Sequence, residues 1–167
     1  MFADISHFTN TSDYLPILVA VIIVDLIVVA YILSPYSSTK TLRLWYKKFT
    51  FGAFISDILS IFIGIIIARF LYPYIFQDWK LWKFLILLVI VQVCHDTLFY
   101  LFFSAIPRGA SSIMDLFQDY SKELRGFAIF GDSMMMIFAG IVASFLATQS
   151  TNTNLILLII GIYISPY

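Results

Sequence analysis

Five polar side chains that could bind a cation or relay protons lie inside apolar stretches of this sequence. They are Asp57, Gln92, His95, Asp96 and Asp132. A charged side chain at the centre of a bilayer costs about 2.5–3.5 kcal/mol on insertion scales, so such residues are usually kept for a reason. Intramembrane acids and histidines commonly relay protons or line ion pathways. The same groups can also join helices through hydrogen bonds, and the sequence leaves both alternatives open.

The surroundings of Asp57 and Asp132 match at a fixed offset of 75 residues. Residues 47–71 and 122–146 share seven identities, and both segments carry small residues on the helical face that holds the aspartate. Small residues on one face let two helices approach closely. The packing positions that we predict are Ala53, Gly64, Ala68, Ala128, Ala139 and Ala143. A duplication would produce this match, and so would two unrelated helices with the same packing requirement.

The polar side chains fall at one predicted depth in the membrane. Asp57 and Asp132 lie near the beginnings of their apolar runs, and His95 and Asp96 lie near the end of theirs. Because these runs alternate in direction and a helix rises 1.5 Å per residue, the groups fall within about 5 Å of one level. We therefore predict one polar cluster in the cytoplasmic third of the bundle. The residue types alone do not decide whether it holds a metal ion.

Two further charged residues lie within the apolar runs, apart from the predicted cluster. Asp25 lies nearer the middle of the membrane on an otherwise aliphatic segment, and Arg69 lies near the outer end of its run. A long arginine side chain can extend its guanidinium to the interface while its methylene groups stay in the apolar layer. We expect Arg69 to do so rather than to form a buried ion pair.

The elements that must position these groups are apolar runs long enough to cross a hydrocarbon core about 30 Å thick. Of the 167 residues, 61% are hydrophobic and only 12% are charged, whereas soluble domains have about 25% charged residues. The expected spans are residues 14–33, 49–71, 81–103 and 127–147. A last apolar run within residues 154–166 is short, and it fits a half-span, an interfacial helix or a fifth span completed by flanking residues. The predicted fold is an all-α, polytopic transmembrane helical bundle that forms a single domain over residues 1–167.

A cytoplasmic amphipathic helix is expected over residues 112–125. Its apolar residues recur at helical spacing and its charged residues face elsewhere, a pattern typical of a helix that lies on a membrane surface. Such a helix serves either as a simple connector or as a docking site for a partner, and the sequence does not choose between the two.

The basic residues predict the orientation of the chain. The connections that precede residues 49 and 127 carry seven Lys or Arg, against three on the other side of the membrane. The positive-inside rule places these two connections in the cytoplasm. The N-terminus is therefore expected on the non-cytoplasmic side of the membrane.

The composition narrows the classes of function. The net charge is zero, so no overall field recruits nucleic acid, and the expected partners are the lipid bilayer and further copies of the chain. We find no glycine-rich phosphate loop and no nucleophile elbow, so we expect neither a cofactor nor an enzyme. The first hypothesis is a structural or assembly component whose acidic cluster specifies helix packing. The alternatives are a small cation- or proton-conducting protein and a membrane-embedded enzyme that modifies lipid.

Three stretches of the sequence together resemble a known protein family. They are AFISDILSIFIGIIIARFLYP (53–73), HDTLFYLFFSAIPRG (95–109) and FQDYSKELRGFAIFGDS (117–133). They are similar to an uncharacterised family of small multi-span membrane proteins encoded by large nucleocytoplasmic DNA viruses. The resemblance covers residues 49–147. It implies a virus-encoded protein in a host membrane or in the internal membrane of a virion, and it implies no activity and no functional residues.

Overall fold

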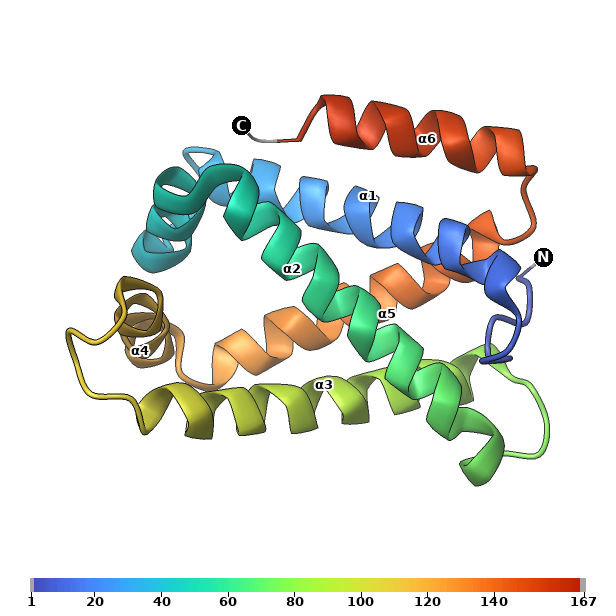
Figure 1. The fold of residues 1–167 in the computed structure, drawn as a ribbon, viewed down its shortest axis with the longest axis horizontal. Coiled ribbons are helices and arrows are strands. Elements are labelled where there is room, and N and C mark those ends of the chain that lie inside the picture. Colours follow the sequence, from blue (N-terminus) through green and yellow to red (C-terminus); the bar gives the residue numbers. More distant parts are fainter. Residues whose placement is uncertain (1, 166–167) are drawn as a thin grey trace.

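The structure is a computed structural model, and it describes residues 2–165. Within this range the chain forms six α-helices and one short 3-10 helix, without any strand (Figure 1). The α-helices are α1 (Tyr14–Leu33), α2 (Lys40–Ile75), α3 (Leu81–Ser104), α4 (Ser112–Leu124), α5 (Gly126–Leu146) and α6 (Thr151–Tyr163), and the 3-10 helix is Thr11–Asp13. Helices α1, α2, α3 and α5 are long and apolar enough to cross a membrane. The predicted fold class is confirmed: the chain is an integral membrane protein built as an all-α helical bundle.

Three of the predicted spans are confirmed to within one residue. Helix α1 has the expected bounds, α3 extends one residue further, and α5 begins and ends one residue earlier than expected. The second span differs, because α2 begins at Lys40 rather than at residue 49 and continues through Pro73 to Ile75. Pro73 is tolerated because it lies in the last turn, where a proline removes one backbone hydrogen bond without interrupting a longer helix.

Helix α2 consists of two helical segments that meet at a sharp corner. Thr50, at this corner, has φ 42° and ψ −119°, and Arg125, between α4 and α5, has φ 50° and ψ −132°. A positive φ is uncommon outside glycine and is a clear outlier for a β-branched residue such as threonine. The two corners lie 75 residues apart, the same offset that relates Asp57 to Asp132.

These corners define a structural repeat of two halves. In each half, a span with an aspartate eight residues before its end (Asp25 in α1, Asp96 in α3) leads to a short helix and a positive-φ corner. A second span follows, with an aspartate seven residues beyond the corner. We call residues 40–49 and α4 the two surface helices, and the end of the bundle where they lie the surface-helix end. Shared packing needs alone would not require the same unusual backbone at the same spacing, so the match supports duplication.

The strain at the first corner gives a testable prediction. We expect Thr50→Gly to raise the free energy of unfolding by about 1 kcal/mol. The strain that a non-glycine residue stores in a sparsely populated backbone region, about 1–3 kcal/mol, exceeds the extra conformational freedom of glycine in the unfolded chain, about 0.5–1 kcal/mol. Thermal unfolding in detergent measures the change. Thr50→Ala is the control, because alanine keeps the strain and should give no gain. An unchanged or lower midpoint for Thr50→Gly would contradict the prediction.

Close contacts between the spans fill the part of the bundle away from the surface helices. Helix α1 packs against α2, α5 and α6, and α3 packs against α2 and α5. Five of the six predicted small residues are buried, namely Ala53, Gly64, Ala68, Ala139 and Ala143, and Ala128 is half-buried. A Cβ atom added to Gly64 would lie 2.9 Å from Cε of Met136. The absence of a side chain at Gly64 therefore allows α2 and α5 to approach this closely.

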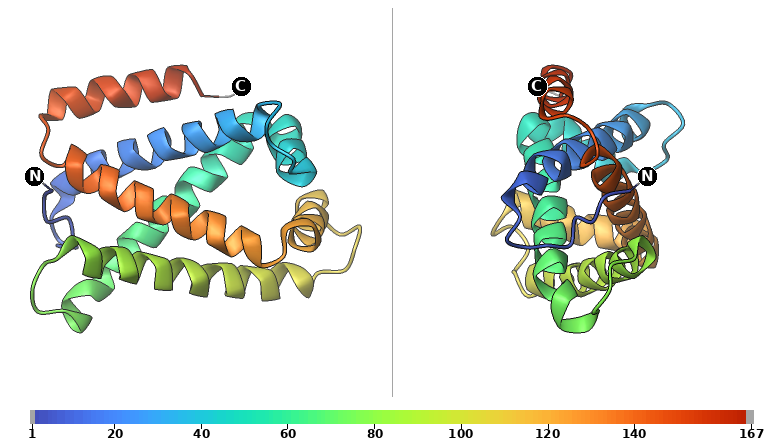
Figure 2. Two further views of the ribbon diagram at one scale, coloured as in Figure 1. Left: turned by 180° about the vertical axis from the view of Figure 1, so that it is seen from behind. Right: turned by 90° about the vertical axis from the view of Figure 1, so that its right-hand side faces the viewer.

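The last apolar run forms α6, a helix of 13 residues. At 1.5 Å per residue it is about 20 Å long, shorter than the hydrocarbon core. It runs along the outside of α1 (Figure 2), and the buried Asn154 side chain donates to the carbonyl oxygens of Leu146 and Ser150. Helix α6 is thus a short helix packed on the bundle rather than a full-length fifth span. Residues 166 and 167, the first of them inside the predicted run, lie outside the described residues.

Candidate functional site

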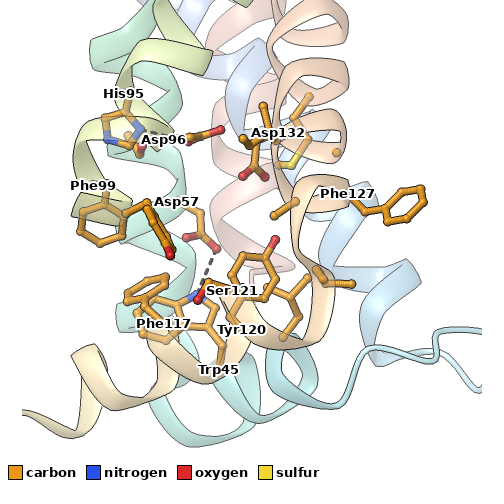
Figure 3. Close-up of a pocket in the computed structure, with 18 of the residues that line it drawn as sticks. Trp45, Asp57, His95, Asp96, Phe99, Phe117, Tyr120, Ser121, Phe127 and Asp132 are labelled. Atoms are coloured by element: carbon orange, nitrogen blue, oxygen red, sulfur yellow. Dashed lines mark hydrogen bonds and ion pairs between the residues drawn. The ribbon is translucent and has the colours of Figure 1, made fainter. Parts of the chain in front are cut away.

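A cavity of about 980 Å³ lies between α2, α3, α4 and α5 at the surface-helix end (Figure 3). All five side chains of the predicted cluster line it: Asp57, Gln92, His95, Asp96 and Asp132. Their carboxylates come from three helices, because α2, α3 and α5 each contribute one aspartate. The structure therefore gathers the five residues around one shared space.

Asp57 joins the first surface helix to the span that follows it. Its carboxylate accepts hydrogen bonds from Oη of Tyr46 at 2.7 Å and from Nε1 of Trp45 at 3.2 Å. Figure 3 shows Asp57 and Trp45 on the cavity wall. Both donors precede the corner at Thr50 and the acceptor follows it, so the carboxylate holds the two segments of α2 at their angle. This role is structural, but it acts within α2 rather than between two spans.

Asp96 forms a second local network, on α3. Its Oδ1 accepts a hydrogen bond from Nε2 of Gln92 at 2.7 Å and lies 3.3 Å from Nδ1 of His95. Gln92 is buried, whereas His95 is half exposed and its ring stacks on that of Phe99. The second oxygen of Asp96, Oδ2, is buried and has no hydrogen-bond partner among residues 2–165. The network therefore leaves one buried carboxylate oxygen unsatisfied beside the cavity.

Asp132 has the fewest partners of the three acids. Within the described part of the chain its carboxylate makes no hydrogen bond and no ion pair, and it points into the cavity (Figure 3). In the second half of the repeat, Ser121 takes the place of Tyr46, and its hydroxyl donates to the carbonyl of Gln118 instead. Asp132 therefore lacks the donors that satisfy Asp57, and its oxygens remain available to a ligand.

Aromatic rings form much of the remaining wall, and the sequence pattern did not indicate them. They are Trp45, Tyr46, Phe99, Tyr100, Phe103, Phe117, Tyr120 and Phe127. The ring of Phe117 lies 5.1 Å from that of Trp45 and 5.0 Å from that of Phe99, between centroids. One available signal could have found two of these residues: Trp45 and Tyr120 are 75 residues apart, as are the matching aspartates.

Helix α4 forms the end wall of the cavity. It occupies the range predicted for the amphipathic helix, less one residue, and its Leu116 side chain is buried against the bundle. Nε2 of Gln118 donates to the carbonyl oxygens of Phe103 and Ile106, at 2.9 and 2.8 Å, and so fixes α4 to the end of α3. The apolar face that was expected to lie on a membrane surface is packed on the protein itself.

Asp25 lies outside the cavity, in agreement with its predicted separation from the cluster. Its side chain is fully buried in α1, and neither carboxylate oxygen has a hydrogen-bond partner within residues 2–165. An unpartnered buried polar group costs about 1–3 kcal/mol. Asp25 is therefore a destabilising residue of the first half of the repeat, although it occupies the position that Asp96 holds in the second.

Arg69 is buried in an ion pair, so the expectation that it reaches the interface is wrong. Its side chain is fully buried, and its Nη2 lies 2.9 Å from Oδ2 of Asp13. The same nitrogen donates to the backbone carbonyls of His7 and Asn10, and the guanidinium lies over the ring of Tyr14. The physical reason is that the N-terminal segment folds over the bundle end opposite the surface helices. It supplies acceptors there that hydropathy does not reveal.

Within residues 2–165, no three His, Cys, Asp or Glu side chains are grouped so that they could hold a metal ion. The site instead combines separate carboxylates with aromatic faces, two features that attract organic cations. Comparison of the chain with models of protein families, with curated proteins and with solved structures finds no match. The geometry of the cavity is therefore the basis on which a function can be proposed.

Proposed function

We propose that the protein binds an amphiphilic molecule with a cationic head group inside this cavity. The observation that carries the proposal is the composition of the wall, in which three carboxylates from three helices lie among aromatic and aliphatic side chains. Ligand pockets typically have volumes of about 300–1,000 Å³ and are mostly apolar, with a few placed polar groups that orient the ligand. Aromatic faces and carboxylates both stabilise an ammonium group, by about 0.5–2 kcal/mol for each aromatic contact.

The position of the cavity supports binding of a ligand at one end of the bundle rather than passage of an ion through a single copy of the chain. Asp57 and Asp132 lie seven residues beyond the corners at Thr50 and Arg125, and Asp96 lies eight residues before the end of α3, a depth of about 11 Å. Beyond them, the methyl group of Met136 fills the space over Gly64, and Leu85 and Leu88 fill the space over Gly140. A cationic head group could thus enter from the surface-helix end while its apolar chain lies along the aromatic wall.

Ligand binding to the purified protein in lipid nanodiscs tests the proposal. In a Trp79→Phe/Trp82→Phe background, Trp45 in the cavity wall reports occupancy by its fluorescence. Octyltrimethylammonium should bind saturably and at least about tenfold more tightly than octanol. Asp132→Asn should weaken the binding of octyltrimethylammonium by at least about tenfold. The quaternary ammonium has no N–H, so it interacts with the carboxylate through charge alone; close charge pairs contribute about 1.5 kcal/mol or more, and 1.4 kcal/mol corresponds to tenfold.

Asp132→Asn is a clean variant because it removes a charge without breaking a hydrogen bond within the described structure. Asp119→Asn, an exposed acid on α4 outside the cavity wall, is the matched control and should leave the affinity unchanged. Equal affinity for the ammonium and the alcohol, or the same loss of affinity in both variants, would count against the proposal.

A structural or assembly role is the second candidate, and the bonds of Asp57 favour it specifically. Because Asp57 ties the first surface helix to its span through Trp45 and Tyr46, Asp57→Asn would loosen the corner whether or not a ligand binds. The resemblance to the viral family would place such a component in a host or virion membrane. In this case Asp57→Asn lowers the thermal stability and the recovery of assembled protein, and no cationic amphiphile saturates the wild-type cavity.

A further inference from the structure

The two surface helices meet along one seam that covers the cavity. Side chains from residues 40–49 and from α4 line the same space, and the two helices are in contact. Each surface helix is bound to its own half of the repeat. The first is held by the hydrogen bonds to Asp57, and the second by those of Gln118. The seam is therefore the boundary between the halves at this end of the bundle.

Glu123 makes every hydrogen bond that crosses the seam within the described residues. Its Oε1 accepts from the backbone N–H of Lys40 and its Oε2 from that of Thr41, both at 2.8 Å, and the Thr41 hydroxyl also donates to Oε2. These N–H groups belong to the first turn of α2, where they have no partner within the helix, and the preceding Thr39 provides no side-chain cap. Glu123 thus caps a helix that belongs to the other half of the repeat.

The charge of Glu123 suits this position. Slight burial of the Glu123 carboxylate raises its pKa. The hydrogen bonds from Thr41 and from the backbone of Lys40 outweigh this effect and hold the pKa below its usual value. The carboxylate is therefore ionised at neutral pH, and a negative charge at a helix N-terminus is stabilised by the helix dipole. Phe117 and Trp45 add an aromatic contact across the same seam.

We propose that Glu123 is a latch that holds the two surface helices together over the cavity, and that its release admits the ligand. The proposal rests on the proposed function, because it describes how access to the same site is controlled. The corners at Thr50 and Arg125 supply the hinges. Each holds a strained backbone conformation, and such strain concentrates where a segment must move. A small rotation at either corner would part the seam while the spans remain packed.

Chemical access to the cavity tests the latch without any ligand. Ser60 lines the cavity on α2, so Ser60→Cys in a Cys94→Ser background reports access to a water-soluble maleimide. We expect Glu123→Ala to raise the labelling rate about fivefold, the change that corresponds to the loss of one N-cap interaction of about 1 kcal/mol. Glu123→Gln, which retains an acceptor oxygen, should give an intermediate rate. Asp119→Ala is the matched control, because Asp119 lies on the same helix and pairs with Arg108 away from the seam.

A distance measurement between the surface helices provides the second readout. Spin labels at Leu44→Cys and Lys122→Cys in the same Cys94→Ser background, both at exposed positions, should show a wider distance distribution in Glu123→Ala than in Asp119→Ala. Labelling rates and distances that are the same in both variants would overturn the latch. If both measurements change while octyltrimethylammonium still fails to bind, the latch stands and the proposed function fails. If the amphiphile binds but neither measurement changes, the function stands and the latch fails.

Discussion

Arg69→Met is expected to lower the free energy of unfolding by about 3–5 kcal/mol, the cost of breaking a buried ion pair by removing one partner. The methionine has a similar volume but cannot donate a hydrogen bond. The Asp13 carboxylate, only 9% exposed, would lose its cation, and the carbonyls of His7 and Asn10 would lose the donor that they share. Thermal unfolding in detergent, or equilibrium unfolding in mixed micelles, measures the loss. We also expect faster proteolysis of the N-terminal segment, because this cluster fixes it to the bundle.

Two further variants show whether burial of the pair is the cause. Lys80→Met removes an exposed cation just before α3, at the same end of the bundle as Arg69. Nζ of Lys80 lies 3.6 Å from Oδ2 of Asp78, and both side chains are more than half exposed. Exposed ion pairs contribute about 0–1 kcal/mol, so this variant should be nearly neutral. Adding Asp13→Asn to Arg69→Met should recover part of the stability, because the unpaired charge is then removed. A loss below about 1 kcal/mol in Arg69→Met would show that the pair is not needed for the fold.

The spans could be predicted from the sequence because membranes impose a length on apolar helices. A helix must carry about 20 apolar residues to cross the hydrocarbon core, so α1, α3 and α5 followed directly from hydropathy. The depth of the polar residues followed from the same constraint, since a helix rises by a fixed distance per residue. For this reason the sequence predicts Asp57, Asp96 and Asp132 at one level, and in the structure the side chains of all three line one cavity.

The corner at Thr50 could not be predicted, because threonine gives no sign of a positive φ. Local sequence rules assign such a backbone to glycine, and Gly52 and Gly126 near the two corners do not occupy the unusual positions. The sequence therefore predicts a connection over residues 40–49, where the structure has a surface helix. The offset of 75 residues could have indicated this helix, because it relates residues 40–49 to the amphipathic helix predicted over residues 112–125.

The partners of Arg69 could not be predicted from the sequence for a different reason. Asp13 lies 56 residues away along the chain, and no local pattern links an arginine near the end of one span to a segment that precedes another. The sequence alone therefore predicts that the Arg69 guanidinium reaches the interface, which is the more common arrangement for arginine in membranes. Buried ion pairs of this kind are tertiary features, and they depend on how the helices pack rather than on the pattern of any one helix.

Gly140→Leu is expected to lower the free energy of unfolding by about 3 kcal/mol, because overpacking a close contact usually costs about 1–3 kcal/mol and a whole leucine side chain lies at the upper end. A Cβ atom at Gly140 would lie 2.5 Å from Cδ1 of Leu88 and 2.9 Å from Cδ2 of Leu85. Leu88 is fully buried, so it cannot turn aside into lipid. The substitution should therefore force α3 and α5 apart, which would also distort the wall that carries Asp96 and Asp132.

Leucine substitutions at two other glycines should give a graded series of effects on stability. Gly131 lies inside the same helix with no atom within 4 Å of its missing Cβ, so Gly131→Leu should raise the free energy of unfolding by about 0.5–1 kcal/mol, the amount that a glycine inside a helix costs. Gly64 faces only the flexible end of Met136, and methionine adapts to a changed space, so Gly64→Leu should fall between the other two. Thermal unfolding of the three variants in one detergent gives the order. If Gly131→Leu destabilised the protein as much as Gly140→Leu, the cost would come from leucine on α5 in general, and the contact between α3 and α5 would not be the cause.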